Sequence, residues 1–230
     1  MQIGGLMGFV LLLLVISYII MQYRLGHGNL HDFVVSLRRM GNHDGSYALR
    51  VWDANQRNSY FYDFNAGKSL EEVAAVAQKF ADNMATIAVA AKGATHPATD
   101  MVIAQIEEGK MEIGMGQHGE GGGGLTEMKT ADETAAIMID ALLRDLDIKK
   151  GEKLLVIVNG VGATTLMEQL IVFRKCCHYL AEKGIEVVAN IVGEVLTVQE
   201  MAGFQLFIAR MDDELLKYWN APCRTPYYKN

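Results

Sequence analysis

The sequence predicts an α/β fold from about residue 66 onward, with helices layered on a sheet. Apolar runs typical of buried strands alternate there with segments whose apolar residues recur at helical spacing. Capping residues precede the helical segments, and glycine follows several of them. Of the 230 residues, 50% are hydrophobic and only three are proline, which is enough for a full core built from regular secondary structure.

The first helix of this region is predicted to begin after Ser69, whose side chain can cap it. Two glutamates follow in the first turn, where the helix dipole favours negative charge. The apolar residues that then recur at helical spacing are Val73, Val76, Ala77, Phe80 and Met84. We expect this helix to continue to near Gly93, before Pro97.

Two strands and one helix are predicted in the middle of the region. Residues 111–116, MEIGMG, alternate in character and predict a strand that runs into a loop. Thr130 is expected to cap a second amphipathic helix that ends before Lys149. Residues 153–160, KLLVIVNG, form an apolar run closed by Asn-Gly, which indicates a buried strand.

The pattern repeats to the end of the chain. Thr164 or Thr165 is expected to cap a third helix that stops at Gly184. Strands are predicted over residues 184–193 and 204–211, and a short helix over residues 212–219. Residues 66–230 are therefore expected to form one α/β domain.

Residues 1–22 form an apolar N-terminal helix in this interpretation. No charge occurs from residue 3 to residue 21, and the run is long enough to cross a hydrocarbon core of roughly 30 Å. Arg24, Arg38 and Arg39 follow, and they would place the remainder in the cytoplasm if the segment spans a membrane. The alternatives are a buried core helix and an upstream piece misjoined to this chain. A basic region and a cleavage site typical of a signal peptide are not evident.

Residues 23–65 are expected to form a linker with a short hairpin of unknown role. Aromatic and β-branched residues flank a turn signal at Asp53–Asn55, which predicts the hairpin over residues 47–64. His27 and His31 stand four apart, with Asp32 beside them. A metal site and solvated polar side chains are both compatible with this pattern.

Composition excludes some classes of function. The net charge of −6 argues against a nucleic-acid-binding protein, because phosphate contacts need a basic face. Three cysteines cannot form a disulfide framework, and they indicate a reduced, intracellular protein.

The segment GMGQHGEGGGG, residues 114–124, is the strongest candidate for chemistry. His118 lies between a strand end and a run of glycines, where a neutral imidazole can act as a nucleophile, a base or a metal ligand. Glu120 could orient the ring, and the glycines allow a ligand to approach closely. The alternative is a flexible glycine loop whose histidine is merely solvated.

A second segment, residues 159–165, joins a buried strand to a helix. Free amides at the helix start would suit an anion or a hydroxyl group, although the segment is neither a P-loop nor G-x-G-x-x-G. Most strand–helix turns need glycine and a capping threonine in any case. The remaining polar candidates are expected to have structural roles. We expect a helix start at Asp212, Asp213 and Glu214, packing residues at Cys176, Cys177 and His178, and a loop residue at His96.

Four segments together resemble the second half of the substrate-binding K subunit of the dihydroxyacetone kinase family. They are EIGMGQHGEGGGG, VNGVGATTLMEQLIVFRK, VGEVLTVQEMAGFQLFIARMDDELL and APCRTPYY. The resemblance runs from about residue 66 to the C-terminus and implies helices on a mixed sheet. It also implies that His118 binds the ketone of dihydroxyacetone covalently as a hemiaminal, with Gly116, Gly119 and Glu120 as further substrate-binding residues.

The same resemblance implies a division of labour. K subunits take a second histidine and an acid–base from an earlier domain, in segments G-G-G-S-G-H-E-P and N-Y-T-G-D, and residues 1–65 contain neither. The chain is expected to bind no cofactor or metal itself. Phosphate would come from ATP with Mg²⁺, or from a phosphotransferase system, through an L-type partner.

A homodimer in the cytoplasm is expected, and residues 3–21 are the candidate membrane anchor. The alternatives in function are a non-catalytic ligand sensor and a gene fragment without activity.

Overall fold

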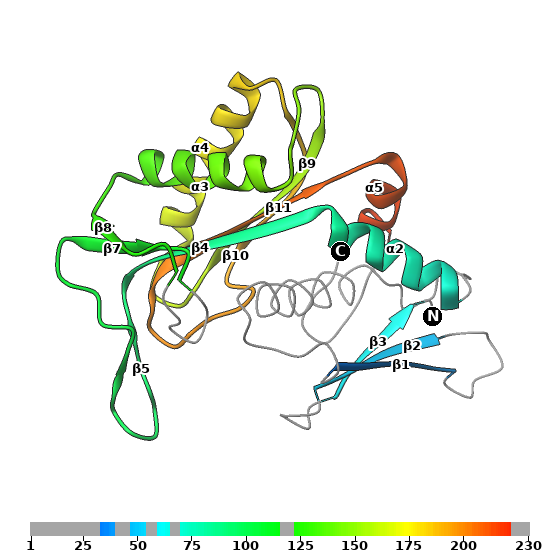
Figure 1. Cartoon of the computed structure of the whole chain (residues 1–230), viewed down its shortest axis with the longest axis horizontal. Helices are drawn as coiled ribbons and strands as arrows, with labels where there is room; N and C mark the ends of the chain where they lie inside the picture. The colour runs from blue at the N-terminus through cyan, green and yellow to red at the C-terminus, as the bar shows by residue number, and fades with distance from the viewer. Residues whose placement is uncertain (1–32, 40–46, 54–58, 65–69, 116–121, 222–230) are drawn as a thin grey trace. The chain divides into compact units, whose positions relative to one another are not determined.

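The computed structural model describes residues 33–39, 47–53, 59–64, 70–115 and 122–221 (Figure 1). These residues group into two compact units. One comprises the described residues up to Asn83 together with those from Asp212, and the other comprises Met84–Met211. Each unit is described by itself.

The first unit begins with a three-stranded antiparallel sheet in the order β1-β2-β3. Its strands are β1 (Phe33–Arg39), β2 (Tyr47–Asp53) and β3 (Ser59–Phe64). β2 and β3 pair with Trp52 opposite Ser59, which confirms the predicted hairpin. β1 was not predicted, because the histidine- and glycine-rich sequence around it was interpreted as a linker.

Helices α2 (Leu70–Asp82) and α5 (Asp213–Trp219) belong to the same unit. Asp212 caps α5 by accepting a hydrogen bond from the Leu215 amide at 2.9 Å. Lys79 of α2 forms ion pairs with Asp212 and Glu214, the latter at 2.6 Å. These hydrogen bonds raise the pKa of Lys79. The acidic cluster is therefore a helix start, as predicted.

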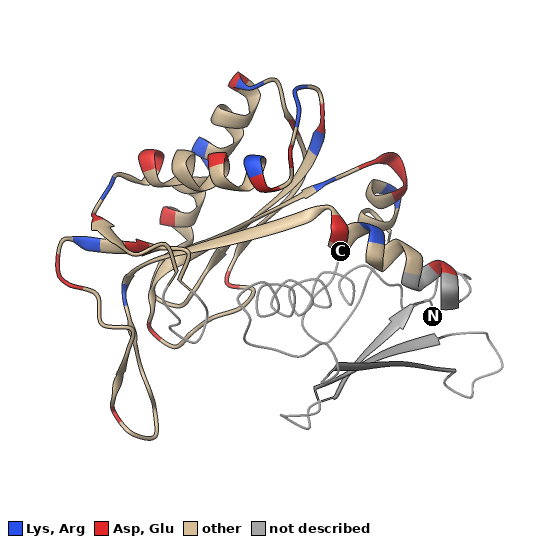
Figure 2. Cartoon of the chain, in the orientation of Figure 1, with Lys and Arg blue, Asp and Glu red and all other residues tan. Residues whose placement is uncertain are grey.

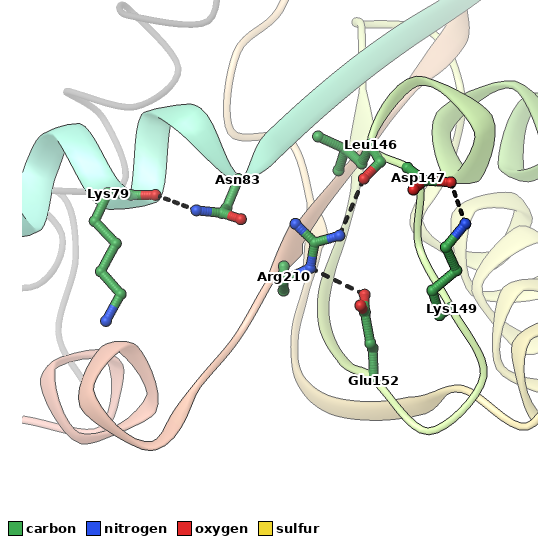
Figure 3. Close-up of polar contacts among 7 residues, drawn as sticks. All are labelled: Lys79, Asn83, Leu146, Asp147, Lys149, Glu152 and Arg210. Carbon is green, nitrogen blue, oxygen red and sulfur yellow. Dashed lines mark hydrogen bonds and ion pairs between the residues drawn. The ribbon is translucent and has the colours of Figure 1, made fainter.

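The first predicted helix was too long. α2 ends at Asp82, where Asn83 donates its side-chain amide to the Lys79 carbonyl at 2.8 Å (Figure 3), and β4 (Met84–Lys92) follows. Residues MATIAVAAK include three β-branched residues, Thr86, Ile87 and Val89, and β4 lies between β11 and β7 within its sheet. Pairing on both sides therefore outweighs the helix propensity of its four alanines.

The second unit is built on a six-stranded sheet in the order β10-β9-β11-β4-β7-β8. β9 and β10 run parallel, and the other pairs are antiparallel, which confirms a mixed sheet. Within the three central strands β4, β9 and β11, charged residues occur only at the strand ends (Figure 2). The remaining strands of the sheet are β7 (Lys110–Ile113), β8 (Leu125–Glu127), β9 (Lys153–Gly160), β10 (Glu186–Gly193) and β11 (Ala202–Arg210). A separate two-stranded ribbon consists of β5 (Ala94–Thr95) and β6 (Val102–Ile103).

Helices α3 (Ala131–Asp145) and α4 (Leu166–Glu182) pack on one face of this sheet (Figure 1). Both begin with a complete capping box, formed by Thr130 with Glu133 and by Thr165 with Glu168. The core below them takes alternate residues from the central strands and the inner stripes of the helices. Its fully buried members include Met138, Ile139, Leu154, Leu180 and Leu206.

Arg210 at the end of β11 fastens the connection between α3 and β9. Its Nε donates to a Glu152 carboxylate oxygen at 2.9 Å, and a terminal nitrogen donates to the Leu146 carbonyl at 3.0 Å (Figure 3). One side chain thereby holds the end of a helix and the start of a strand against the neighbouring strand.

Among the residues described, no helix is long and apolar enough to cross a membrane. The candidate span at residues 3–21 lies outside them, as do His27, His31 and Asp32.

Candidate functional site

The predicted site segment joins β7 to β8. These strands pair as a hairpin with Met111 opposite Thr126 and Glu112 opposite Leu125. His118, Gly116, Gly119 and Glu120 lie outside the described residues, so their assignment stays a prediction. The structure does describe both ends of the segment, at Met115 and at Gly122.

Close backbone contacts join these two ends. Gly114, with φ of +88°, donates its amide to the Ala88 carbonyl of β4 at 2.6 Å. The Gly123 amide donates to the Ile113 carbonyl at 2.8 Å. A Cβ atom on Gly122 would lie 1.8 Å from the Gly114 carbonyl oxygen, so only glycine fits there. The described residues on the two sides of this segment, Gly114 and Gly122–Gly123, are therefore held together beside β4.

Met115, the last described residue before position 116, belongs to a small apolar cluster. It is 4% exposed and packs with Ala90, Val161 and Met201. Val161 belongs to the second predicted segment, residues 159–165. The structure thus brings the two candidate segments together, although Met115 and Val161 are 46 residues apart in the sequence.

Asn159 at the end of β9 holds the residues that follow β10. Its Oδ1 accepts from the amides of Val195 and Leu196 at 2.7 and 2.9 Å, and its Nδ2 donates to the Leu196 carbonyl at 2.8 Å. The side chain is 1% exposed, so these bonds satisfy a polar group that has left water. Asn159 therefore fixes the loop after β10 beside the second segment.

Gly160 is required by two polar side chains that pack over it. A Cβ there would lie 1.8 Å from Glu194 Oε1 and 2.1 Å from Gln169 Nε2. Gln169, fully buried on α4, donates to Glu194 Oε1 at 2.6 Å and to the Thr164 carbonyl at 2.8 Å. The glycine of this turn thus has a packing reason and needs no ligand to explain it.

The first turn of α4 is capped by the chain itself. The Thr165 hydroxyl accepts from the Glu168 amide, and the Glu168 carboxylate accepts from the Thr165 amide at 2.8 Å. Hydrogen bonds from the Thr165 hydroxyl and amide lower the pKa of Glu168. A carboxylate at this position disfavours a second anion, so the anion site suggested by the sequence has no support here.

An apolar groove of about 290 Å³ lies between the starts of α3 and α4, and the sequence did not point to it. Its rim includes Met128 and Ile171, which are 49% and 42% exposed. The first turns of α4 add three exposed apolar side chains, Leu166, Met167 and Leu170. A sequence signal for this exposed apolar surface was present, because α4 has more apolar residues than are needed for one stripe facing the core.

Of the other candidates, the two cysteines and His96 proved structural, whereas His178, predicted to be a packing residue, is exposed on α4. Cys176 is buried, and burial raises the pKa of its thiol to about 12, so it is a packing residue. Burial also raises the pKa of Cys177. His96 accepts from the Ala98 amide within a turn. In the described part of the chain, no group of three or more His, Cys, Asp or Glu residues could hold a metal ion.

Sequence comparison connects this chain to one family. Residues 63–227 match the family described as the Dak1 domain. The dihydroxyacetone-binding subunit DhaK of the PTS-dependent dihydroxyacetone kinase 2 of Listeria innocua is 35% identical over 163 residues, or 71% of this chain and 49% of that protein. The D-erythrulose kinase of Mycolicibacterium smegmatis is 36% identical over 163 residues, or 71% of this chain and 28% of that protein.

Solved structures agree in fold. A structure titled as the dihydroxyacetone kinase operon co-activator Dha-DhaQ has a TM-score of 0.64 at 25% identity, covering 68% of this chain and 49% of that one. The dihydroxyacetone kinase of C. freundii has a TM-score of 0.57 at 25% identity, covering 67% and 28% respectively.

The chain spans about half the length of the DhaK relatives that it matches, and less than a third of the erythrulose kinases. The match nevertheless runs through the histidine segment, both strands that flank it, and the Asn159 turn that packs beside it. On this basis, the chain belongs to the Dak1 domain family.

Proposed function

We propose that this chain binds dihydroxyacetone, or a related short ketose, through a covalent hemiaminal at His118. Gly116, Gly119 and Glu120 would line the bound ketose. The family match over residues 63–227 carries the proposal, because it contains this segment and several relatives are named as dihydroxyacetone-binding subunits. The backbone contacts that hold Gly114, Gly122 and Gly123 on either side of this segment support the proposal.

The chemistry balances without an added reagent. The unprotonated ring nitrogen of His118 attacks the ketone carbon, and a C–N bond forms while the C=O π bond breaks. The ketone oxygen takes up a proton, and the other ring nitrogen releases one, so the adduct is neutral. A protonated imidazole has no free lone pair, so the adduct should weaken as the pH falls below the pKa of His118.

Phosphoryl transfer would need a partner. Some relatives are named as PTS-dependent or PEP-dependent kinase subunits, whereas the erythrulose kinases are named without a donor. In this proposal an L-type subunit or domain brings ATP with Mg²⁺, or phosphate from a phosphotransferase system. The chain alone is expected to show no ATP-dependent turnover, because losing a general base typically costs 10²–10⁴-fold in rate and the donor site is elsewhere.

The decisive test uses dihydroxyacetone labelled with carbon-13 at its carbonyl. The full chain should convert the ketone signal into that of a tetrahedral carbon, and His118→Ala should abolish the change. An equal adduct in the variant would refute the assignment of His118. Phosphorylation is then assayed with and without an added L subunit.

A ligand sensor is the second candidate, and a specific observation favours it. The solved structures that match include one titled as an operon co-activator and another titled as regulation of the dha operon of Lactococcus lactis. A sensor would form the same adduct but show no turnover with any L subunit or donor. Adduct formation together with partner-dependent phosphorylation would instead support the kinase.

A further inference from the structure

The first two turns of α4 present a run of apolar side chains to the solvent. Leu166, Met167, Leu170 and Ile171 are between 42% and 69% exposed. Exposed apolar residues that stand singly are ordinary, whereas contiguous ones usually mark an interface. The apolar groove of about 290 Å³ between α3 and α4 opens beside them, because Ile171 belongs to its lining.

The charged residues around this run follow a definite order along the helix. Glu168 stands three residues before Ile171, and Arg174 stands three residues after it. All three side chains are exposed, and residues three apart are neighbours on a helix surface. The outer face of α4 is therefore acidic, then apolar, then basic from its start toward its middle.

This order is complementary to itself only when two copies of the helix pack in opposite directions. In an antiparallel pair related by a two-fold axis at Ile171, Glu168 of each copy faces Arg174 of the other, and the apolar residues meet between these charges. A parallel pair would place like charges opposite each other. Charge complementarity therefore points to a second copy of this chain as the occupant of the face.

Both charged groups can accept a second partner. The Thr165 amide and hydroxyl donate to one carboxylate oxygen of Glu168, Oε2. Arg174 donates to Asp132 of α3 through one terminal nitrogen, and a guanidinium group carries five N–H donors. Each side chain can keep its partner within the chain and still form an ion pair across the axis.

We propose that this face of α4 is an interface between two copies of the chain, packed antiparallel about a two-fold axis at Ile171. The inference is independent of the proposed function, because it uses no residue of the histidine segment. Burial of the apolar residues supplies most of the affinity, since exposed ion pairs contribute little, and the ion pairs fix the direction of packing. One helix face makes a small interface, so we expect a dissociation constant on the order of 10 μM.

A cysteine on the axis gives a direct test, because it lies next to its own copy in the other chain. In a full-length chain with Cys177→Ser and Cys223→Ser, Ile171→Cys should form a disulfide between two copies under mild oxidation. Asn190→Cys is the matched control, because Asn190 is exposed on β10, and it should remain largely uncrosslinked. Equal cross-linking at the two positions would overturn the proposal.

Sedimentation equilibrium of the full-length chain then measures the affinity, and the melting temperature of each variant is recorded. Leu170→Glu should raise the dissociation constant at least about thirtyfold, because it places a carboxylate in the apolar centre of the interface. Arg174→Glu should raise it about threefold, because acidic groups would then face each other. Met101→Glu is the control, since Met101 is an exposed apolar residue between β5 and β6, and it should leave the affinity unchanged.

A wild-type chain that stays monomeric throughout a range of about 1–200 μM overturns the proposal. Association that is equally tight in wild type and Leu170→Glu also overturns it, because the copies would then meet through another surface. If Leu170→Glu does not fold, the comparison of Ile171→Cys with Asn190→Cys still decides.

Discussion

Asn159 offers the sharpest test of how the two candidate segments are held. Replacing it with alanine removes four hydrogen bonds: two from the amides of Val195 and Leu196, one to the Leu196 carbonyl, and a longer one of 3.4 Å to Gln205 Oε1. A neutral hydrogen bond contributes about 0.5–1.5 kcal/mol net. Leu196 is 37% exposed, so its backbone groups can regain water in the variant. We therefore expect Asn159→Ala to lower the free energy of unfolding by about 2–3 kcal/mol.

Urea unfolding of the full chain, followed by circular dichroism, measures this difference, and the melting temperature should fall by about 4–10 °C for a chain of this size. Asn190→Ala is the matched control, because Asn190 is exposed on β10, the parallel neighbour of β9. It should change the free energy of unfolding by no more than about 0.5 kcal/mol. If the two alanine variants are equally stable, the bonds of Asn159 do not hold this loop.

Two further predictions concern ionisable groups. In a Cys223→Ser background, Cys176 should react with a thiol reagent at pH 8 only on unfolding, because burial raises the pKa of its thiol to about 12. Cys177 is less buried and should react before unfolding. Equal reaction rates of the two thiols in the native protein would contradict this prediction. Glu168→Ala should be less stable than wild type at pH 7, because Thr165 lowers the folded-state pKa of Glu168 below its unfolded value. That contribution is complete above the unfolded value near 4.5 and is lost as the pH falls through the folded value, so the two urea midpoints should converge in acid.

The sequence was informative wherever a local chemical rule decides the structure. Thr130 was predicted to cap a helix, and Thr165 was one of two predicted caps for the next; both carry complete capping boxes. KLLVIVNG occupies β9 from its first residue to its last, because a buried strand that pairs on both sides has few alternatives. Such signals lie within a few residues of one another in the sequence.

Structural features that depend on partners far away in the sequence were not predicted. MATIAVAAK was interpreted as the end of a helix, because the preceding helical pattern continues as far as Met84 and alanine favours helix. The strand exists because β11 and β7 pair with it, and those strands lie roughly 20 to 120 residues further along the chain. The hydrogen bonds of the Asn159 side chain could not be predicted for the same reason, because their partners are 36 and 37 residues away in the sequence.

The glycine run after His118 shows why the site was only half predictable. We interpreted those glycines as room for a ligand, but the hairpin accounts for three of the four. Gly122 and Gly123 lack space for a Cβ, which would lie 1.8 and 2.6 Å from the carbonyl oxygens of Gly114 and Ile113, and Gly124 has φ of +87°. The argument for a ligand therefore rests on His118 and its immediate neighbours, and the glycines act indirectly. They bring the Gly122 amide within 2.7 Å of Glu112, a carboxylate that stands six residues before the histidine and that no local pattern distinguishes from any other strand glutamate.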